Sequence, residues 1–128
     1  AVNELTAIGR GDWPAVTQIV FRNYQWGAEK RNTTLWYQDN FVGTELNYEV
    51  SYAGIAEACN LKGVVARTME DLTAALNQAI KDQMENGVTT LIEAMINQEL
   101  GEPFRRDAMT APVAVAGIDA KDMRPQQV

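Results

Sequence analysis

Apolar residues in the first part of the chain follow a helical period and then a strand-like run. Residues 2–8 place apolar side chains three positions apart, which predicts one face of a helix that the following glycines end. Residues 15–21 are rich in β-branched and aromatic residues and predict a strand. The polar and aromatic residues 22–27 have no sustained period, so we expect a loop at the carboxyl end of that strand.

Residues 28–50 carry a weak pattern, whereas the segment after them carries a clear one. Asn, Thr, Asp and aromatic residues dominate the weak part, which predicts only a short helix over residues 32–37. Ser51 can cap the next helix, and Asn60 tolerates the left-handed conformation that often ends one. We expect the buried stripe of this helix to contain Tyr52, Ile55, Ala56 and Cys59.

The strongest helical signal in the chain lies between two short apolar runs. Thr68 can cap this helix, acidic residues occupy its first turn, and Gly87 can end it. Residues 63–67 before it and 89–96 after it predict strands, and the nearly continuous apolar run of the second is typical of a strand covered on both faces. The expected buried stripe of the helix contains Leu72, Ala75, Leu76, Ala79, Ile80 and Met84.

The order of these elements predicts an α/β fold, in which a parallel sheet carries helices on both faces and its crossovers are right-handed. A length of 128 residues suits one such core. We expect residues 1–100 to form this domain, and residues 101–128, rich in Pro, Ala and charge, to form a tail that runs over a surface.

Composition and charge narrow the classes of partner and of chemistry. The net charge of -6 repels nucleic acid and anionic membranes, so we expect neither as a partner. The single cysteine, the absence of an apolar run long enough to cross a bilayer and the absence of a signal peptide favour the cytoplasm. Without histidine, the chain cannot supply a Ser-His or Cys-His pair or an imidazole-bound zinc. Because it starts without Met and part-way into a helix, we expect the natural chain to extend upstream of Ala1.

The first place to look for chemistry is the end of the first predicted strand, because ligands of parallel α/β sheets bind beyond the carboxyl ends of the strands. The amide oxygen of Asn23 and the backbone carbonyl of Gln25 are oxygen donors of the kind that Mg²⁺ prefers. Two oxygens do not complete an octahedral site, so the other ligands would come from a carboxylate elsewhere, a bound diphosphate and water. Composition alone favours the simpler interpretation that Asn23 closes a turn.

The same residues carry a family resemblance. Residues 4–7, 13–14, 16–21 and 23–27 resemble the second half of the motif of thiamine-diphosphate-dependent enzymes, which opens with Gly-Asp-Gly and ends with Asn-Asn. The resemblance covers nearly the whole chain and implies part of the C-terminal diphosphate-binding domain, with thiamine diphosphate and Mg²⁺ as cofactors and with Asn23 and Gln25 as cofactor-binding and metal-binding residues.

The chain departs from this motif in two places. Arg22 stands where the motif has the first asparagine, whereas the resemblance makes the second asparagine the metal ligand. Gly-Asp-Gly is missing and would lie upstream of Ala1, so the metal aspartate is absent from these residues. The resemblance also implies that the glutamate that activates the cofactor belongs to another domain, and no catalytic residue can be named within this chain.

Three further blocks, residues 22–32, 41–46 and 99–108, resemble the family of acetyltransferases that act on sulfoacetaldehyde. This resemblance implies a fragment of a transferase of taurine degradation that converts sulfoacetaldehyde and phosphate to acetyl phosphate and sulfite. It also implies a homo-oligomer, either a dimer or a tetramer, and we expect the fragment alone to be inactive. Two alternatives remain, namely another thiamine-diphosphate carboligase, such as an acetolactate-synthase-like enzyme, and a non-catalytic α/β association module.

Several other residues have both a structural and a functional interpretation. Trp26 and Trp36 are expected to fill a core or an interface rather than line a substrate pocket. Glu93, in an apolar strand, is expected to be structural because the sequence shows no partner for it. Arg105 and Arg106 could bind an oxyanion, but pairing at a surface or interface is favoured. We expect Cys59 to be a small apolar filler and residues 29–31 to form a solvated loop.

Overall fold

The computed structural model describes residues 2–99, which divide into two compact units. The sheet unit consists of residues 2–23 and 48–97, and the helix unit consists of residues 24–47 together with residues 98 and 99. Residues 101–128, with Arg105 and Arg106, lie outside the described residues, so the expected boundary at residue 100 stays a prediction.

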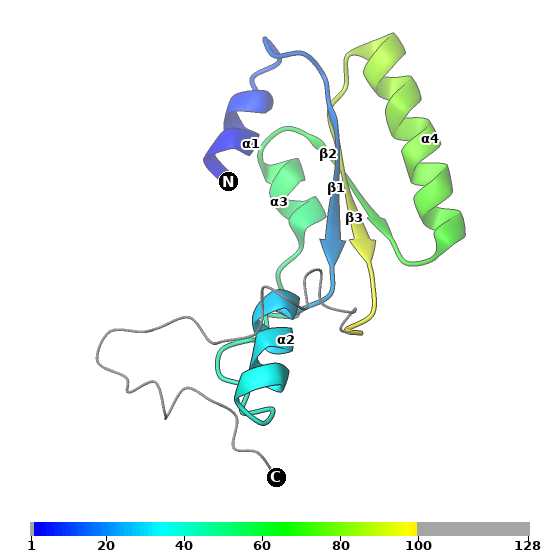
Figure 1. Ribbon diagram of the computed structural model, residues 1–128. Coiled ribbons are helices and arrows are strands. Elements are labelled where there is room, and N and C mark those ends of the chain that lie inside the picture. The colour runs from blue at the N-terminus through cyan, green and yellow to red at the C-terminus, as the bar shows by residue number, and fades with distance from the viewer. Residues whose placement is uncertain (1, 100–128) are drawn as a thin grey trace. The chain divides into compact units, whose positions relative to one another are not determined.

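The sheet unit contains three parallel strands, β1 (Thr17–Arg22), β2 (Lys62–Ala66) and β3 (Thr90–Met95) (Figure 1). Their order in the sheet is β1-β3-β2, so the last strand along the chain is the central one. Ile92 of β3 lies opposite Ile19 of β1 and Val64 of β2. The predicted parallel α/β fold is therefore confirmed.

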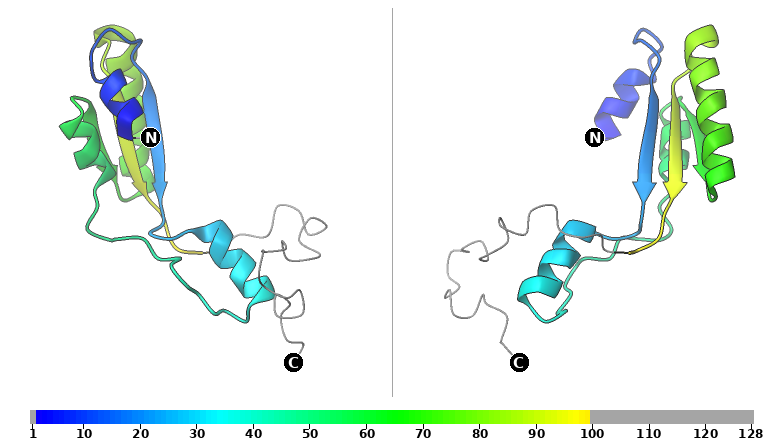
Figure 2. Two further views of the ribbon diagram at one scale, coloured as in Figure 1. Left: turned by 90° about the vertical axis from the view of Figure 1, so that its left-hand side faces the viewer. Right: turned by 45° about the vertical axis from the view of Figure 1, so that its right-hand side comes forward.

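Helices cover both faces of this sheet. Helices α1 (Val2–Ile8) and α3 (Tyr52–Ala58) lie on one side of the strands and α4 (Met69–Asn86) on the other (Figures 1 and 2). Successive side chains of a strand point to opposite faces, and β3 divides its core residues accordingly. On one face Leu91 packs with Ala56 and Leu61, and with the half-buried Leu5, Ile8, Val20, Tyr52 and Cys59. On the other face Ile92 packs with Ala66 and Ala79, and with the half-buried Leu72, Ala75 and Leu76.

The predicted helix caps are present. The Ser51 side chain accepts a hydrogen bond from the Gly54 backbone N–H at the start of α3. Thr68 and Asp71 form a capping box at the start of α4, and Gly87 ends that helix in the left-handed conformation with a φ of 62°. Asn60 is also left-handed, with a φ of 65°. These local signals fix the ends of helices independently of the core.

One glycine is required by a close approach between α3 and β2. A Cβ atom built on Gly63 would lie 2.3 Å from the backbone oxygen of Ala53. Because that atom belongs to the backbone, it cannot swing aside as a flexible side chain would. Gly63 therefore lets the strand lie directly against the helix, which brings the start of α3 to the sheet.

Three sequence predictions were wrong in detail. Helix α2 (Gly27–Trp36) begins five residues before the expected start at residue 32, so residues 29–31 belong to a helix and not to a loop. Its start lacks a side-chain cap, so no local signal marks the first turn of this helix. Ile80 and Met84 on α4 are 49% and 77% exposed, although the helical period placed them in the buried stripe.

Among the helices within residues 2–99, none combines the length and the apolar character that a membrane span requires.

Candidate functional site

Asn23 directly follows β1 at the carboxyl end of the sheet, where the sequence places the candidate site. Its side chain is half-buried. The backbone oxygen of the preceding residue, Arg22, accepts a hydrogen bond of 3.0 Å from the Ile96 backbone N–H. The chain that leads into Asn23 is thus held by the end of β3.

Arg22 and Glu93 form a buried ion pair beside Asn23. The guanidinium donates from one nitrogen to the Glu93 carboxylate and from another, over 3.0 Å, to the Tyr48 backbone oxygen. It also lies 5.4 Å from the centre of the Tyr52 ring. The Arg22 side chain is 7% exposed and the Glu93 side chain 1%, so the pair is almost fully removed from water.

The second oxygen of Glu93 binds the start of α3. It accepts hydrogen bonds from the Ser51 hydroxyl at 3.2 Å and from the Ala53 backbone N–H at 2.9 Å. Burial disfavours the charged carboxylate, but the Ala53 N–H and Arg22 outweigh that effect and hold the pKa of Glu93 below its ordinary value. The structural role expected for Glu93 is confirmed, and its partner, which the sequence did not show, is Arg22.

In the helix unit, Tyr24 has a φ of 60°, an uncommon conformation for a residue that is not glycine. It precedes Gln25, which forms an isolated antiparallel bridge with Glu45. The two hydrogen bonds of this bridge run from the Trp26 N–H to the Thr44 oxygen and from the Leu46 N–H to the Tyr24 oxygen, both at 2.8 Å. The bridge fixes the backbone on both sides of Gln25.

The Gln25 side chain is buried within a polar network of the same unit. Its amide nitrogen donates to the Gln98 backbone oxygen at 2.8 Å, and its amide oxygen accepts from the Lys30 ammonium at 3.0 Å. Lys30 also pairs with Glu45, which accepts a further hydrogen bond from the Gln98 side chain. The hydrogen bond from Lys30 lowers the pKa of Glu45. The Gln25 side chain thus has a structural role, so a ligand role would fall to its backbone oxygen.

The oxygen atoms of Asn23 and Gln25 determine which metal ion these two residues could bind. The Asn23 amide and the Gln25 carbonyl offer neutral oxygens, which suit a hard cation such as Mg²⁺ and fit a metal that is also bound by a diphosphate. Residues 2–99 contain no group of three or more His, Cys, Asp or Glu side chains that could hold a metal ion by themselves. Each residue therefore offers an oxygen that suits Mg²⁺, and the described residues supply no complete metal site of their own.

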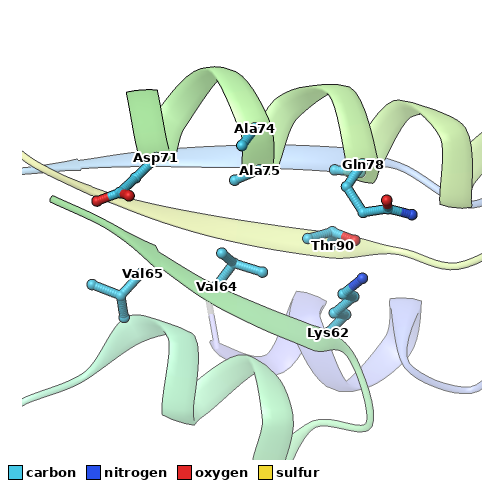
Figure 3. A pocket seen from close by; sticks show the side chains of 9 residues that line it. Lys62, Val64, Val65, Asp71, Ala74, Ala75, Gln78 and Thr90 are labelled. Carbon is cyan, nitrogen blue, oxygen red and sulfur yellow. The ribbon is translucent and has the colours of Figure 1, made fainter. Parts of the chain in front are cut away.

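A groove between β2 and α4 is the alternative place for a ligand (Figure 3). Figure 3 shows Asp71 at one end of the groove and Lys62 and Gln78 at the other, with the buried Thr90 between Lys62 and Gln78. Lys62 and Gln78 both bind Asp82, at 2.6 Å and 2.8 Å. With these two groups engaged and most of the remaining lining aliphatic, the groove offers few polar groups to a ligand.

The structure confirms the predicted role of Cys59 but not that of the two tryptophans. Cys59 packs against the core cluster of Ala56, Leu61 and Leu91, which confirms its role as an apolar filler. Trp26 is 54% exposed and Trp36 is half-buried, so neither fills a core fully within its own unit. The sequence also missed Lys30, which lies in α2 and binds Gln25 and Glu45.

Comparison with known sequences gives a consistent set of similarities. The family described as thiamine pyrophosphate enzyme, C-terminal TPP binding domain, matches residues 1–94. A sulfoacetaldehyde acetyltransferase of Roseovarius nubinhibens is 81% identical over 128 residues, which cover all of this chain and 21% of that relative. One of Rhodobacter capsulatus is 77% identical over 126 residues, 98% of this chain and 21% of the relative.

The similarity extends to more distant relatives. A sulfoacetaldehyde acetyltransferase of Castellaniella defragrans is 49% identical over 113 residues, which cover 88% of this chain and 19% of the relative. The chain thus spans about a fifth of the length of the curated relatives it matches.

Proposed function

We propose that this chain is part of a sulfoacetaldehyde acetyltransferase. The premise is that the chain belongs to the thiamine pyrophosphate enzymes and carries part of their C-terminal TPP binding domain. The complete enzyme would convert sulfoacetaldehyde and phosphate to acetyl phosphate and sulfite, and these 128 residues alone would be inactive. The observation that carries the proposal is the 81% identity to a relative of that name, which extends over every residue of the chain.

We assign two ligands of a Mg²⁺ ion to this chain, the side-chain oxygen of Asn23 and the backbone oxygen of Gln25. The position of Asn23 at the carboxyl end of β1 supports the first assignment. The bridge that fixes the backbone on both sides of Gln25 supports the second. The uncommon conformation of Tyr24 between them agrees with this, because strained backbone is frequent at ligand sites.

The cofactor would supply the carbon centre that accepts electrons from the substrate, and the protein would hold its diphosphate and exclude competing reactions. Within this chain, the task is to present oxygen ligands to the metal on the diphosphate. The remaining ligands, including a carboxylate, would come from the diphosphate, from water and from residues outside this chain.

The direct test is a titration of cofactor and Mg²⁺ into the complete protein that contains this chain. Asn23→Ala removes a ligand, so we expect cofactor binding at fixed Mg²⁺ to weaken by at least the roughly tenfold that is typical of lost support around a metal. Asn77→Ala, at an exposed position of α4, is the matched control and should leave the affinity unchanged. An unchanged affinity in Asn23→Ala would refute the ligand assignment.

A second assay tests the substrate. Sulfite release from sulfoacetaldehyde, in the presence of phosphate, is expected of the complete protein. Turnover of 2-oxo acids without sulfite release would instead indicate another carboligase of the same family. Binding of neither cofactor nor substrate would leave a non-catalytic association module.

We further propose that the complete protein is a cytoplasmic homo-oligomer, a dimer or a tetramer. Large apolar side chains that are exposed within their own units, such as Phe21 at 64% and Val42 at 81%, support burial against other parts of the complete protein or another subunit. Light scattering after size-exclusion chromatography measures the oligomer, and a monomer would contradict this proposal.

A further inference from the structure

We propose that Arg22 is a positioning residue for Asn23, acting through its contacts with Glu93 and with the Tyr48 backbone. This inference rests on the proposed function, because it takes Asn23 as the Mg²⁺ ligand. It adds a role for a residue that stands outside the ligand set and that the sequence alone marked only as a departure from the Asn-Asn pair.

The Arg22 guanidinium is held at two of its nitrogens. One arm of Arg22 binds the Glu93 carboxylate and another binds the Tyr48 oxygen at 3.0 Å. A guanidinium is planar and rigid, so two bonds in different directions fix its orientation, whereas an ammonium is a point charge on a flexible stem. The side chain of Arg22 is therefore held in one arrangement by β3 and by the segment that leads into α3.

The backbone of Arg22 is held as well as its side chain. The Arg22 carbonyl accepts a hydrogen bond from the Ile96 N–H at 3.0 Å, so both the main chain and the side chain of this residue are fixed. Asn23 is the next residue and shares a peptide plane with Arg22. A fixed Arg22 thus limits the directions in which the Asn23 side chain can leave the sheet.

The polar network continues beyond Glu93 to the start of α3. The other carboxylate oxygen of Glu93 accepts hydrogen bonds from the Ser51 hydroxyl and the Ala53 N–H. A continuous set of polar contacts therefore joins the end of β1 to the first turn of α3. Stability alone explains this arrangement poorly, because buried ion pairs are often no more stabilising than apolar residues of the same size.

The test uses the complete protein with Mg²⁺ and thiamine diphosphate. Arg22→Lys keeps the charge and removes the fork, and Lys62→Arg is the control cation exchange, in the ion pair that joins β2 to α4 within the sheet unit. Calorimetry at fixed cofactor gives the Mg²⁺ dissociation constant, and thermal unfolding gives the midpoint. We expect Arg22→Lys to weaken Mg²⁺ binding about tenfold, and Lys62→Arg to leave it unchanged.

A double variant separates positioning from folding. If Arg22 acts through Asn23, Arg22→Lys should change Mg²⁺ affinity in the wild type and have no further effect when Asn23 is already alanine. Additive losses, or a lower midpoint with unchanged affinity of the folded protein, would overturn the inference. Glu93→Gln is the second variant should Arg22→Lys fail to fold, and the same coupling to Asn23 is expected.

The outcomes also separate this inference from the proposed function. Asn23→Ala with unchanged affinity removes the ligand assignment and the inference with it. Weaker binding in Asn23→Ala with unchanged binding in Arg22→Lys removes the inference alone.

Discussion

The two candidate ligands lie two residues apart, yet the ion pair beside each of them has a different character. Arg22 and Glu93, beside Asn23, are 7% and 1% exposed, whereas Lys30 and Glu45, in the network around Gln25, are 15% and 50% exposed. The difference matches what each ligand would contribute. Asn23 would bind with a side chain, whose direction needs rigid surroundings, whereas Gln25 would bind with a backbone oxygen that the bridge already holds.

The largest loss of stability that tests this contrast is expected in the variant Glu93→Gln. The change leaves the Arg22 charge buried without its partner, so the free energy of unfolding should fall by about 3 kcal/mol. Urea unfolding of the complete protein, followed by the signal of this domain, measures the loss. If the free energy of unfolding falls no more than it does for the same substitution at an exposed carboxylate, the Arg22 guanidinium is in contact with water and the contrast fails.

A smaller effect is expected from Glu45→Gln, because half of that side chain is in contact with water. Solvent and salt screen such pairs, so its urea midpoint should lie much closer to the wild type than that of Glu93→Gln. Raising the ionic strength from roughly 0.05 M to roughly 0.5 M should remove most of the difference between wild type and Glu45→Gln, but not the loss in Glu93→Gln. Equal salt sensitivity of the two variants would break the comparison.

The smallest expected effect is in the response to acid. The pKa of Glu93 is lowered in the folded state, so its contribution to stability is present above the unfolded pKa of about 4.3 and is lost as the pH falls through the folded value. Unfolding below about pH 5 should therefore take up a fraction of a proton less in Glu93→Gln than in the wild type. The pH dependence of the urea midpoint measures this uptake, and identical slopes would contradict the lowered pKa.

Sequence patterns predicted the parts of the molecule that depend on local physics. The capping box of Thr68 and Asp71 and the left-handed Gly87 act within a few residues, and both ends of α4 followed from them. Two features left no local signal in the sequence. The start of α2 has no side-chain cap, and the central place of β3 comes from packing between strands that are distant in sequence.

The candidate site shows the same division. Position after a strand was enough to select Asn23, and an acidic residue in an apolar run was enough to single out Glu93. Their relation through Arg22 needed the register of β1 against β3, in which Arg22 lies opposite Met95. The available signal for this ion pair was the placement of its two residues. Arg22 lies at the end of one predicted strand, and Glu93 lies near the end of another.

The central place of β3 also bears on how the chain folds during synthesis. Among the described strands, β1 and β2 each pair only with β3, so both leave the ribosome before their partner exists. Until residues 90–95 emerge, two unpaired strand edges are exposed to neighbouring chains, which is the state most prone to aggregation. A nascent chain that stalls before Thr90 would therefore lack the pairing of both β1 and β2 with β3.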